Sequence, residues 1–257
     1  MHVKMISLVA IGVGSLLTVG CYDAAAQSPT TDPALVAKGE QLFNDTSLSG
    51  SGTRSCASCH PSNGHTDNKT YVGLAVVPEG DREGRSTPTL WGAGERSVYG
   101  WAGTAPSLEA NIRGIIVNRM KGAEPSQETL DALAAYVRSL PHPKNPQLND
   151  DGVPLASASA EVKRGFDLFI GAGGCGTCHL PPSFDKAAVE DVDTGGKFKV
   201  PALRAVSATA PYFHDGRTPT LADAVKYMWD FYAKKSSAAH PAGEAELSDL
   251  VAYLNAL

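Results

Sequence analysis

Two short motifs constrain this 257-residue chain more than any other feature. Each has two cysteines separated by two residues, with a histidine directly after the second: Cys56, Cys59 and His60, and Cys175, Cys178 and His179. This pattern is the attachment signature of c-type haem, in which two thioether bonds hold the porphyrin and the histidine ligates the iron. We therefore predict two covalently bound haem c groups.

The same cysteine spacing also occurs in dithiol redox pairs and in zinc sites. A structural zinc ion needs four protein ligands, and no further pair of soft ligands lies near either motif in the sequence. The only other cysteine is Cys21, so a structural disulfide is not expected. Two complete motifs in one chain favour haem over both alternatives.

Residues 1–26 are predicted to be a secretory signal peptide. Lys4 supplies a positive charge, an apolar stretch follows, and the small residues Ala24–Ala26 resemble a cleavage site. The apolar stretch is short for a lasting membrane span. We therefore expect a periplasmic protein. Lipid anchoring at Cys21 is the less favoured alternative, because Thr18 occupies a position where leucine is preferred.

The chain repeats one unit twice. Residues 38–43 and 164–169 share a basic residue, a glycine and a final Leu-Phe, and each set precedes one haem motif. Residues 133–140 and 250–257 close the two halves with similar sequences. A repeated order of helix, haem motif, loops and closing helix indicates two copies of one fold.

The first and last helix of each half are expected to cross at a glycine. The expected contacts are Gly39 and Phe43 with Tyr136, and Gly165 and Phe169 with Tyr253. The alternative is a set of ordinary amphipathic helices. The predicted fold class is mainly α, with two c-type cytochrome domains at 27–145 and 146–257, each around one haem and with long irregular loops. A proline-rich polar segment starting at Pro141 is predicted to be an extended linker.

The second half carries a longer signature. It contains Gly196–Arg204, Thr209–Gly216 with the sequence Thr-Ala-Pro-Tyr-Phe-His-Asp-Gly, and Thr220–Val225 followed by Met228. This pattern closely resembles the C-terminal haem domain of the bacterial dihaem cytochrome c peroxidases, whose superfamily includes the MauG-type enzymes. The resemblance extends, more weakly, back to the first haem motif.

The resemblance implies that Met228 is the sixth ligand of the C-terminal haem. A thioether opposite histidine favours ferrous iron and raises the potential, so this haem is expected to store electrons. The alternative is that Met228 only fills a gap in the core. MauG-type enzymes use a tyrosine as this ligand, so the chain resembles them less.

The resemblance also implies a calcium ion between the haems. Its expected ligands are the backbone carbonyls of Thr209 and Pro211, and Asn68 is a weak side-chain candidate. His214 is expected to form hydrogen bonds rather than to ligate iron.

In the first half, the resemblance implies that Glu109 is the acid/base group for peroxide. Its alternative role is a first-turn helix carboxylate after Ser107. Tyr99 replaces the family's distal glutamine, and a phenol can still donate a hydrogen bond to peroxide. Trp91 is a candidate electron relay between the haems, or a packing residue at the domain interface.

No histidine occupies the region where many family members carry a distal ligand to the first haem. His65 and Met120 are the nearest candidates, and neither is favoured. The first haem is therefore expected to be five-coordinate or water-ligated, and to react with peroxide without reductive activation.

The predicted function is a periplasmic cytochrome c peroxidase that reduces hydrogen peroxide to water. Its electron donor is expected to be a small cytochrome c or a cupredoxin, and the family makes a homodimer plausible. A net charge of -5 argues against nucleic acid as a partner. Two alternatives stay open, namely a non-catalytic dihaem electron-transfer cytochrome and a MauG-like oxidase that acts on a partner protein.

Overall fold

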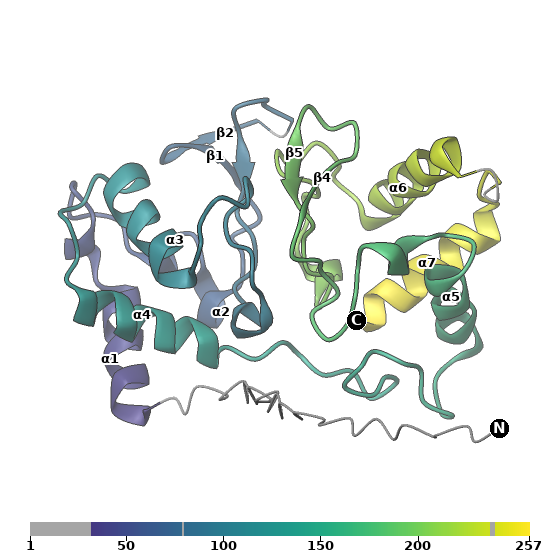
Figure 1. The fold of residues 1–257 in the computed structure, drawn as a ribbon, viewed down its shortest axis with the longest axis horizontal. Coiled ribbons are helices and arrows are strands. Elements are labelled where there is room, and N and C mark those ends of the chain that lie inside the picture. Colours follow the sequence, from purple (N-terminus) through teal and green to yellow (C-terminus); the bar gives the residue numbers. More distant parts are fainter. Residues whose placement is uncertain (1–31, 79, 237–239) are drawn as a thin grey trace, which may run out of the picture. The chain divides into compact units, whose positions relative to one another are not determined.

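The computed structural model describes residues 32–78, 80–236 and 240–257. The predicted signal peptide and Cys21 lie outside these residues. Residues 31–257 form one compact unit. Its helices are α1 (Pro33–Asn44), α2 (Pro61–Gly64), α3 (Leu108–Gly114), α4 (Gln127–Ser139), α5 (Ala160–Ile170), α6 (Leu221–Lys235) and α7 (Glu244–Ala256). Among the described residues, no helix combines the length and the hydropathy that a membrane crossing needs. The predicted mainly α fold is confirmed (Figure 1).

Helix α1 crosses α4, and α5 crosses α7, at the two predicted glycines (Figure 1). A Cβ atom on Gly39 would lie 2.0 Å from the carbonyl oxygen of Ala132, and one on Gly165 would lie 2.0 Å from that of Asp249. Both distances are far below van der Waals contact. Glycine is therefore required at each crossing, because the backbones meet directly there.

The predicted aromatic partners pack beside these crossings. The ring centroids of Phe43 and Tyr136 are 5.1 Å apart, and those of Phe169 and Tyr253 are 5.3 Å apart. Tilted aromatic pairs at this separation add to the energy of burial. The two halves therefore use the same helix packing, as the repeat predicted.

Each half has its own apolar core. One core is centred on α5, α6 and α7, and includes Phe169, Trp229 and Tyr253, with Cys175 packed against it. The other is centred on α1, α3 and α4, and Cys56 packs against it. Both cysteine motifs thus begin at the edge of an apolar core, where a large apolar cofactor would extend the buried surface.

Hydroxyl and carboxylate side chains begin most of these helices. The Oγ atoms of Ser126 and Ser159, and Oγ1 of Thr220, accept hydrogen bonds from backbone N–H groups in the first turns of α4, α5 and α6. Such caps satisfy N–H groups that have no partner inside the helix. The segment from residue 141 to 159 contains no helix, but the prediction of an extended linker was wrong. An isolated bridge pairs Leu148 with Pro154, and Leu148 and Ala158 are buried in the core of the second half.

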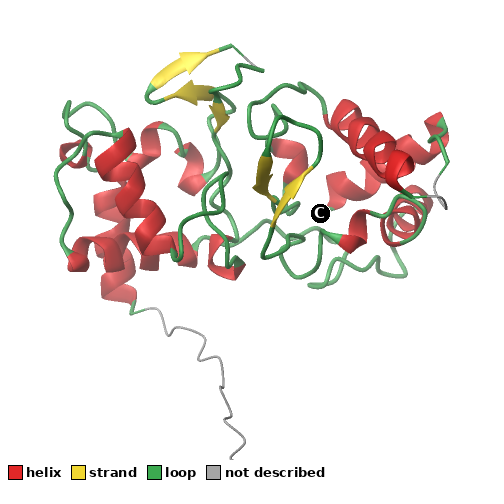
Figure 2. Ribbon diagram, turned by 45° about the horizontal axis from the view of Figure 1, so that its top comes forward, coloured by secondary structure: helices red, strands yellow, loops and turns green. Residues whose placement is uncertain are grey.

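Two small antiparallel sheets were not anticipated. Their strands are β1 (Thr70–Val72), β2 (Ala75–Val77), β3 (Arg85–Ser86), β4 (Val189–Asp191) and β5 (Lys197–Lys199). In one sheet β1 lies between β2 and β3, and in the other β4 pairs with β5 (Figure 2). Strands of two or three residues are too short to show an alternating pattern, so they could not be predicted from hydrophobic periodicity.

Backbone hydrogen bonds join the two halves within the compact unit. The N–H of Ser86 donates to the carbonyl of His214 at 2.8 Å, and that of Lys199 donates to Trp101 at 2.8 Å. The N–H of Gly80 donates to the carbonyl of Asp215 at 2.9 Å. These bonds fix the loops between the two haem motifs, where the predicted functional residues also lie.

Candidate haem sites

Both cysteine motifs adopt the same local structure. A short 3₁₀ turn covers Cys56–Ser58 in one and Cys175–Thr177 in the other. Nδ1 of His60 lies 3.1 Å from the carbonyl oxygen of His65, and Nδ1 of His179 lies 2.9 Å from that of Phe184. When Nδ1 carries the proton and donates to a carbonyl, Nε2 keeps the lone pair that a metal needs.

The ionisation states of both motifs also suit haem. Burial lowers the pKa of His60 to about 4 and also lowers the pKa of His179, so both imidazoles are neutral at pH 7. Burial raises the pKa of Cys56 to about 11 and that of Cys175 to about 12. Catalytic dithiols have lowered pKa values. The dithiol alternative is therefore disfavoured at both motifs.

The second motif opens into a cavity of about 420 Å³. Cys175, Cys178 and His179 line it together with mainly apolar side chains, which include Phe169, Leu203 and Leu254. This volume is within the usual range of pockets that bind small molecules and cofactors. The donor set, the apolar walls and the buried neutral imidazole together fit a covalently bound haem.

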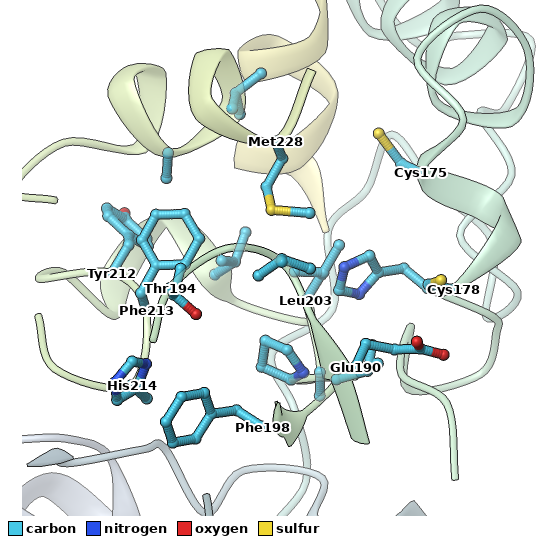
Figure 3. Close-up of a pocket in the computed structure, with 18 of the residues that line it drawn as sticks. Cys175, Cys178, Glu190, Thr194, Phe198, Leu203, Tyr212, Phe213, His214 and Met228 are labelled. Carbon is cyan, nitrogen blue, oxygen red and sulfur yellow. The ribbon is translucent and has the colours of Figure 1, made fainter. Parts of the chain in front are cut away.

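Met228 points into this cavity from α6 (Figure 3). The next residue, Trp229, is only 2% exposed and donates from Nε1 to the carbonyl oxygen of His240 at 2.6 Å. Trp229 therefore belongs to the core, whereas Met228 is half-buried and faces the cavity. This placement favours the ligand role of Met228 over the packing role.

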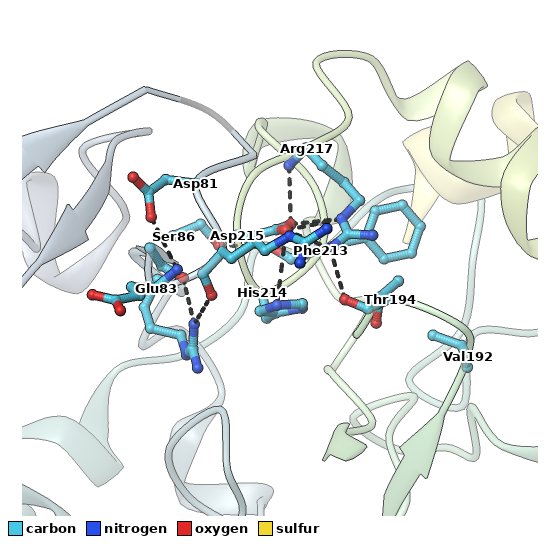
Figure 4. A network of polar contacts seen from close by, with 12 residues as sticks. Asp81, Glu83, Ser86, Val192, Thr194, Phe213, His214, Asp215 and Arg217 are labelled. Atoms are coloured by element: carbon cyan, nitrogen blue, oxygen red, sulfur yellow. Dashed lines mark hydrogen bonds and ion pairs between the residues drawn. The ribbon is translucent and has the colours of Figure 1, made fainter. Parts of the chain in front are cut away.

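The loop after the second motif forms another wall of the cavity. The imidazole of His214 stacks on the Phe198 ring with centroids 3.5 Å apart, and burial lowers its pKa to about 4. Asp215 is fully buried and pairs with the Arg217 guanidinium at 2.6 Å, which in turn donates to the carbonyl of Thr194 (Figure 4). This network fixes the loop against the first half.

The two halves match over a long segment that reaches Met228. Residues 88–115 correspond without a gap to residues 201–228, each position n matching position n + 113. Positive φ angles recur at matched positions, with 66° and 56° at Gly92 and Ala205, and 71° and 67° at Gly100 and Phe213. The correspondence is thus structural as well as sequential.

This register places Ile115 where the second half has Met228. An isoleucine side chain has no atom that can ligate iron. Ile115 is 37% exposed, so it does not serve as a core residue either. The difference between Ile115 and Met228 is visible in the sequence only when the two halves are aligned with each other.

Glu109 lies in the first turn of α3, after the capping residue Ser107. Its carboxylate pairs with Arg138 of α4 at 2.6 Å. Burial acts to raise the pKa of Glu109, but the hydrogen bond from Arg138 and those of the helix N-terminus bring it below its ordinary value. The carboxylate is therefore ionised at neutral pH and can accept a proton.

Tyr99 packs against the same apolar cluster as Cys56, and its hydroxyl donates to the carbonyl oxygen of Arg96 at 2.5 Å. Its phenol and the Glu109 carboxylate are close enough for the charge on Glu109 to act on Tyr99. Within the described part of the chain, no hydrogen bond joins Tyr99 or Glu109 to His60. Their role at the first haem therefore stays a prediction.

Trp91 and His65 form a stacked pair, with ring centroids 4.0 Å apart. Nε1 of Trp91 donates to the carbonyl of Asn63 at 3.0 Å, and Nε2 of His65 lies 3.1 Å from the carbonyl oxygen of Ala208. This pair therefore connects the two halves. The contact engages Nε2 of His65, in agreement with the expectation that His65 does not ligate iron. Met120 is 4% exposed and lies in the core.

Two of the residues expected near the calcium ion, Thr209 and Asn68, form hydrogen bonds to backbone carbonyls with their side chains. The Thr209 hydroxyl donates to the carbonyl of Val206 at 2.8 Å, while Asn68 Nδ2 donates to the carbonyl of Ala208 at 3.3 Å. Among the described residues there is no cluster of three or more histidine, cysteine, aspartate or glutamate side chains that fits a metal ion. Calcium at Thr209 and Pro211 stays a prediction.

Comparisons with known proteins agree with this geometry. Residues 33–146 match the family described as di-haem cytochrome c peroxidase. The chain is 31% identical to the methylamine utilization protein MauG of Methylorubrum extorquens, over 88% of this chain and 78% of that protein. It is 28% identical to the cytochrome c peroxidase Ccp of Escherichia coli, over 90% of this chain and 59% of that protein. Its fold resembles a chain of Kuenenia stuttgartiensis hydrazine synthase, with a TM-score of 0.69, 23% identity, and coverage of 99% and 100% of the two chains.

Proposed function

Because the chain belongs to the family of di-haem cytochrome c peroxidases and MauG proteins, we propose that it is a periplasmic cytochrome c peroxidase. It would reduce hydrogen peroxide to water with electrons from a small cytochrome c or a cupredoxin. The observation that carries this proposal is the inequality of the two sites. Met228 faces the cavity of the second motif, and Ile115 stands at the matching position of the first half.

A peroxidase needs this inequality. One iron must store electrons, which histidine and methionine ligation supports. The other must keep a position open for peroxide, which isoleucine in place of methionine allows. An electron carrier has no need of an open position, so the inequality also favours an enzyme over a simple electron-transfer cytochrome.

In this proposal, Cys56, Cys59 and His60 hold the first haem, and Cys175, Cys178, His179 and Met228 hold the second. When bound, the haems supply the redox chemistry, and the chain supplies ligation, orientation and proton transfer. The Glu109 carboxylate, kept ionised by Arg138, would accept a proton from one peroxide oxygen and return it to the other. The Tyr99 hydroxyl, whose proton is donated to the carbonyl of Arg96, would orient the peroxide by accepting a hydrogen bond from it.

Trp91 supports electron transfer by its location. Its stack on His65, and the contact of His65 with Ala208, form a continuous path between the loops of the two halves. We assign Trp91 the role of relay within the proposed function. Calcium binding at Thr209 and Pro211, and dimerisation, are further parts of the proposal that rest on the family.

A MauG-like oxidase that acts on a partner protein is the second candidate. It is favoured by the 31% identity to a protein named MauG. The family resemblance assigns such enzymes a tyrosine ligand, whereas this chain presents Met228 to the cavity. The methionine therefore gives the peroxidase reading the stronger support.

Steady-state oxidation of reduced cytochrome c by hydrogen peroxide tests the proposal. The holoprotein is expected to turn over. The Glu109→Gln variant should lose about 10²- to 10⁴-fold, the usual contribution of a general acid/base group. Glu128→Gln is a matched control, because Glu128 is an exposed carboxylate paired with Lys38. An inactive parent with both haems attached would overturn the proposal, while full activity of Glu109→Gln would overturn only the assignment of Glu109.

A further inference from the structure

Two cations line the cavity of the second motif, and neither has an ion-pair partner among the described residues. Lys199, on β5, is 7% exposed and lines the cavity. Arg96, directly after the 3₁₀ turn Ala93–Glu95, also lines it. The Nε atom of Arg96 is buried and has no hydrogen-bond partner.

The local structure holds both side chains at the cavity. Nη1 and Nη2 of Arg96 donate to the carbonyls of Thr89 and Trp91 at 3.1 and 2.6 Å, whereas the buried Nε has no hydrogen-bond partner. The backbone N–H of Lys199 donates to the carbonyl of Trp101 at 2.8 Å. Among the described residues, Nζ of Lys199 has no hydrogen bond or ion pair, and β5 directs the side chain toward the cavity.

An unpaired cation in such a place is unfavourable. Burial, together with the nearby charge of Arg96, lowers the pKa of Lys199 to about 7. The charge of Asp185 acts on both cations in the opposite direction, but its carboxylate is not within ion-pair distance of either in the described structure. Buried charges are normally paired, so an anion in the cavity would complete this site.

We propose that Lys199 and Arg96 bind the propionate carboxylates of the haem attached at Cys175 and Cys178. Haem carries two such carboxylates, and the remainder of this cavity is mainly apolar. Charge-assisted hydrogen bonds to carboxylate are the strong ones, and arginine and lysine are their usual donors. The inference rests on haem attachment at the second motif and is independent of peroxidase activity.

The two cations come from different halves of the repeat. Arg96 lies between Trp91 and Tyr99 in the first half, and Lys199 lies between the second motif and Met228. A propionate held by Arg96 would therefore tie the second haem to the segment that carries both Trp91 and Tyr99. Attachment of the second haem would then help to order the first site.

A crystal structure of the holoprotein tests the placement directly. We expect propionate oxygens within hydrogen-bond distance, about 3 Å, of Lys199 Nζ and Arg96 Nε. Propionates that turn away from both side chains would overturn the inference. The covalent haem content per chain is measured first, because a chain without the second haem would refute the premise rather than the inference.

Potentiometric titration of the second haem gives an independent readout. Removing a neighbouring positive charge stabilises ferric iron relative to ferrous iron, so Lys199→Met is expected to shift the midpoint potential downward, while Lys199→Arg keeps it near the parent value. Lys197→Met is the matched control, because Lys197 is an exposed lysine of the same strand and does not line the cavity. Equal shifts in Lys199→Met and Lys197→Met would contradict the proposal. If Lys199→Met fails to fold, Lys199→Gln and Arg96→Gln carry the same test.

Discussion

Met228 is the single residue that separates the two halves most clearly. Met228 faces the cavity of the second haem motif, while its neighbour Trp229 is held in the core by a hydrogen bond to His240. A methionine opposite His179 would raise the potential of that haem, because a thioether favours ferrous iron. Ile115, its counterpart, offers no ligand at all.

We expect Met228→Ala to remove the methionine-to-iron absorption band of the oxidised protein and to lower the potential of one haem. Met120→Leu is the matched control, since Met120 is 4% exposed and lies in the core. The measurement is the absorption spectrum of both oxidised holoproteins. A band that survives in Met228→Ala would mean that Met228 is not the ligand.

Arg138 is expected to determine the pH at which activity is lost on the acidic side of the pH–rate profile. Burial acts to raise the pKa of Glu109, and the hydrogen bond from Arg138 lowers it below its ordinary value. Replacing Arg138 with methionine removes that bond, so the pKa of Glu109 should rise. Activity that needs the carboxylate would then be lost at a higher pH than in the parent. Superimposable pH–rate profiles would contradict the role of this ion pair.

Prediction from sequence worked at the residue scale where covalent chemistry leaves a fixed spacing. The two haem motifs are such a case, whereas the ligand role of Met228 came from the family resemblance and stays a prediction. Arg96 and Lys199 were missed, because an ordinary arginine or lysine shows its burial only after the chain has folded. Ile115 was missed for a different reason, since its signal appears only when the two halves are aligned.

At the scale of elements, the crossing of α5 and α7 organises the second core. Gly165 contacts the backbone of Asp249 directly, and the Phe169 and Tyr253 rings close the space beside it. The sequence predicted this crossing and that of α1 with α4 from repeated glycine and aromatic positions. It did not predict the short strands, whose formation depends on pairing between distant loops.

Gly165→Ala is expected to destabilise the holoprotein by about 3 kcal/mol or more, because its methyl group would lie 2.0 Å from a backbone carbonyl oxygen. Gly114→Ala is the control within helix α3. The nearest atom to its new methyl group would be 3.9 Å away, so alanine should leave stability unchanged or raise it by up to about 1 kcal/mol. Urea unfolding of both variants checks this, and equal stabilities would refute the close crossing.

At the scale of the whole compact unit, an ion pair between a buried aspartate and a more exposed arginine holds the loop that joins the halves. Asp215 is fully buried and bonds the Arg217 guanidinium, while its backbone carbonyl accepts from Gly80 of the first half (Figure 4). Asp215 belongs to the Thr209–Gly216 signature, but its burial and its pairing with Arg217 were not part of the sequence prediction. Its importance follows from the tertiary contact between the halves.

Asp215→Asn is expected to cost about 2 kcal/mol of unfolding free energy, because a buried carboxylate loses its charge-assisted hydrogen bonds from Arg217. Asp150→Asn, in a pair whose carboxylate is 82% exposed, should leave the stability close to that of the parent, because exposed ion pairs contribute little. Burial acts to raise the pKa of Asp215, but Arg217 and other contacts lower it below its ordinary value. The stabilisation by Asp215 should therefore be full at neutral pH and be lost as the pH falls through the folded-state pKa. Equal losses in the two variants would contradict this account.

The central claim is that the two haem sites are unequal. The electronic spectrum and the electron paramagnetic resonance spectrum of the fully oxidised holoprotein test it most directly. We predict one low-spin haem with methionine ligation and one high-spin haem with an open or water-ligated position. Two low-spin haems in the oxidised protein would contradict the claim.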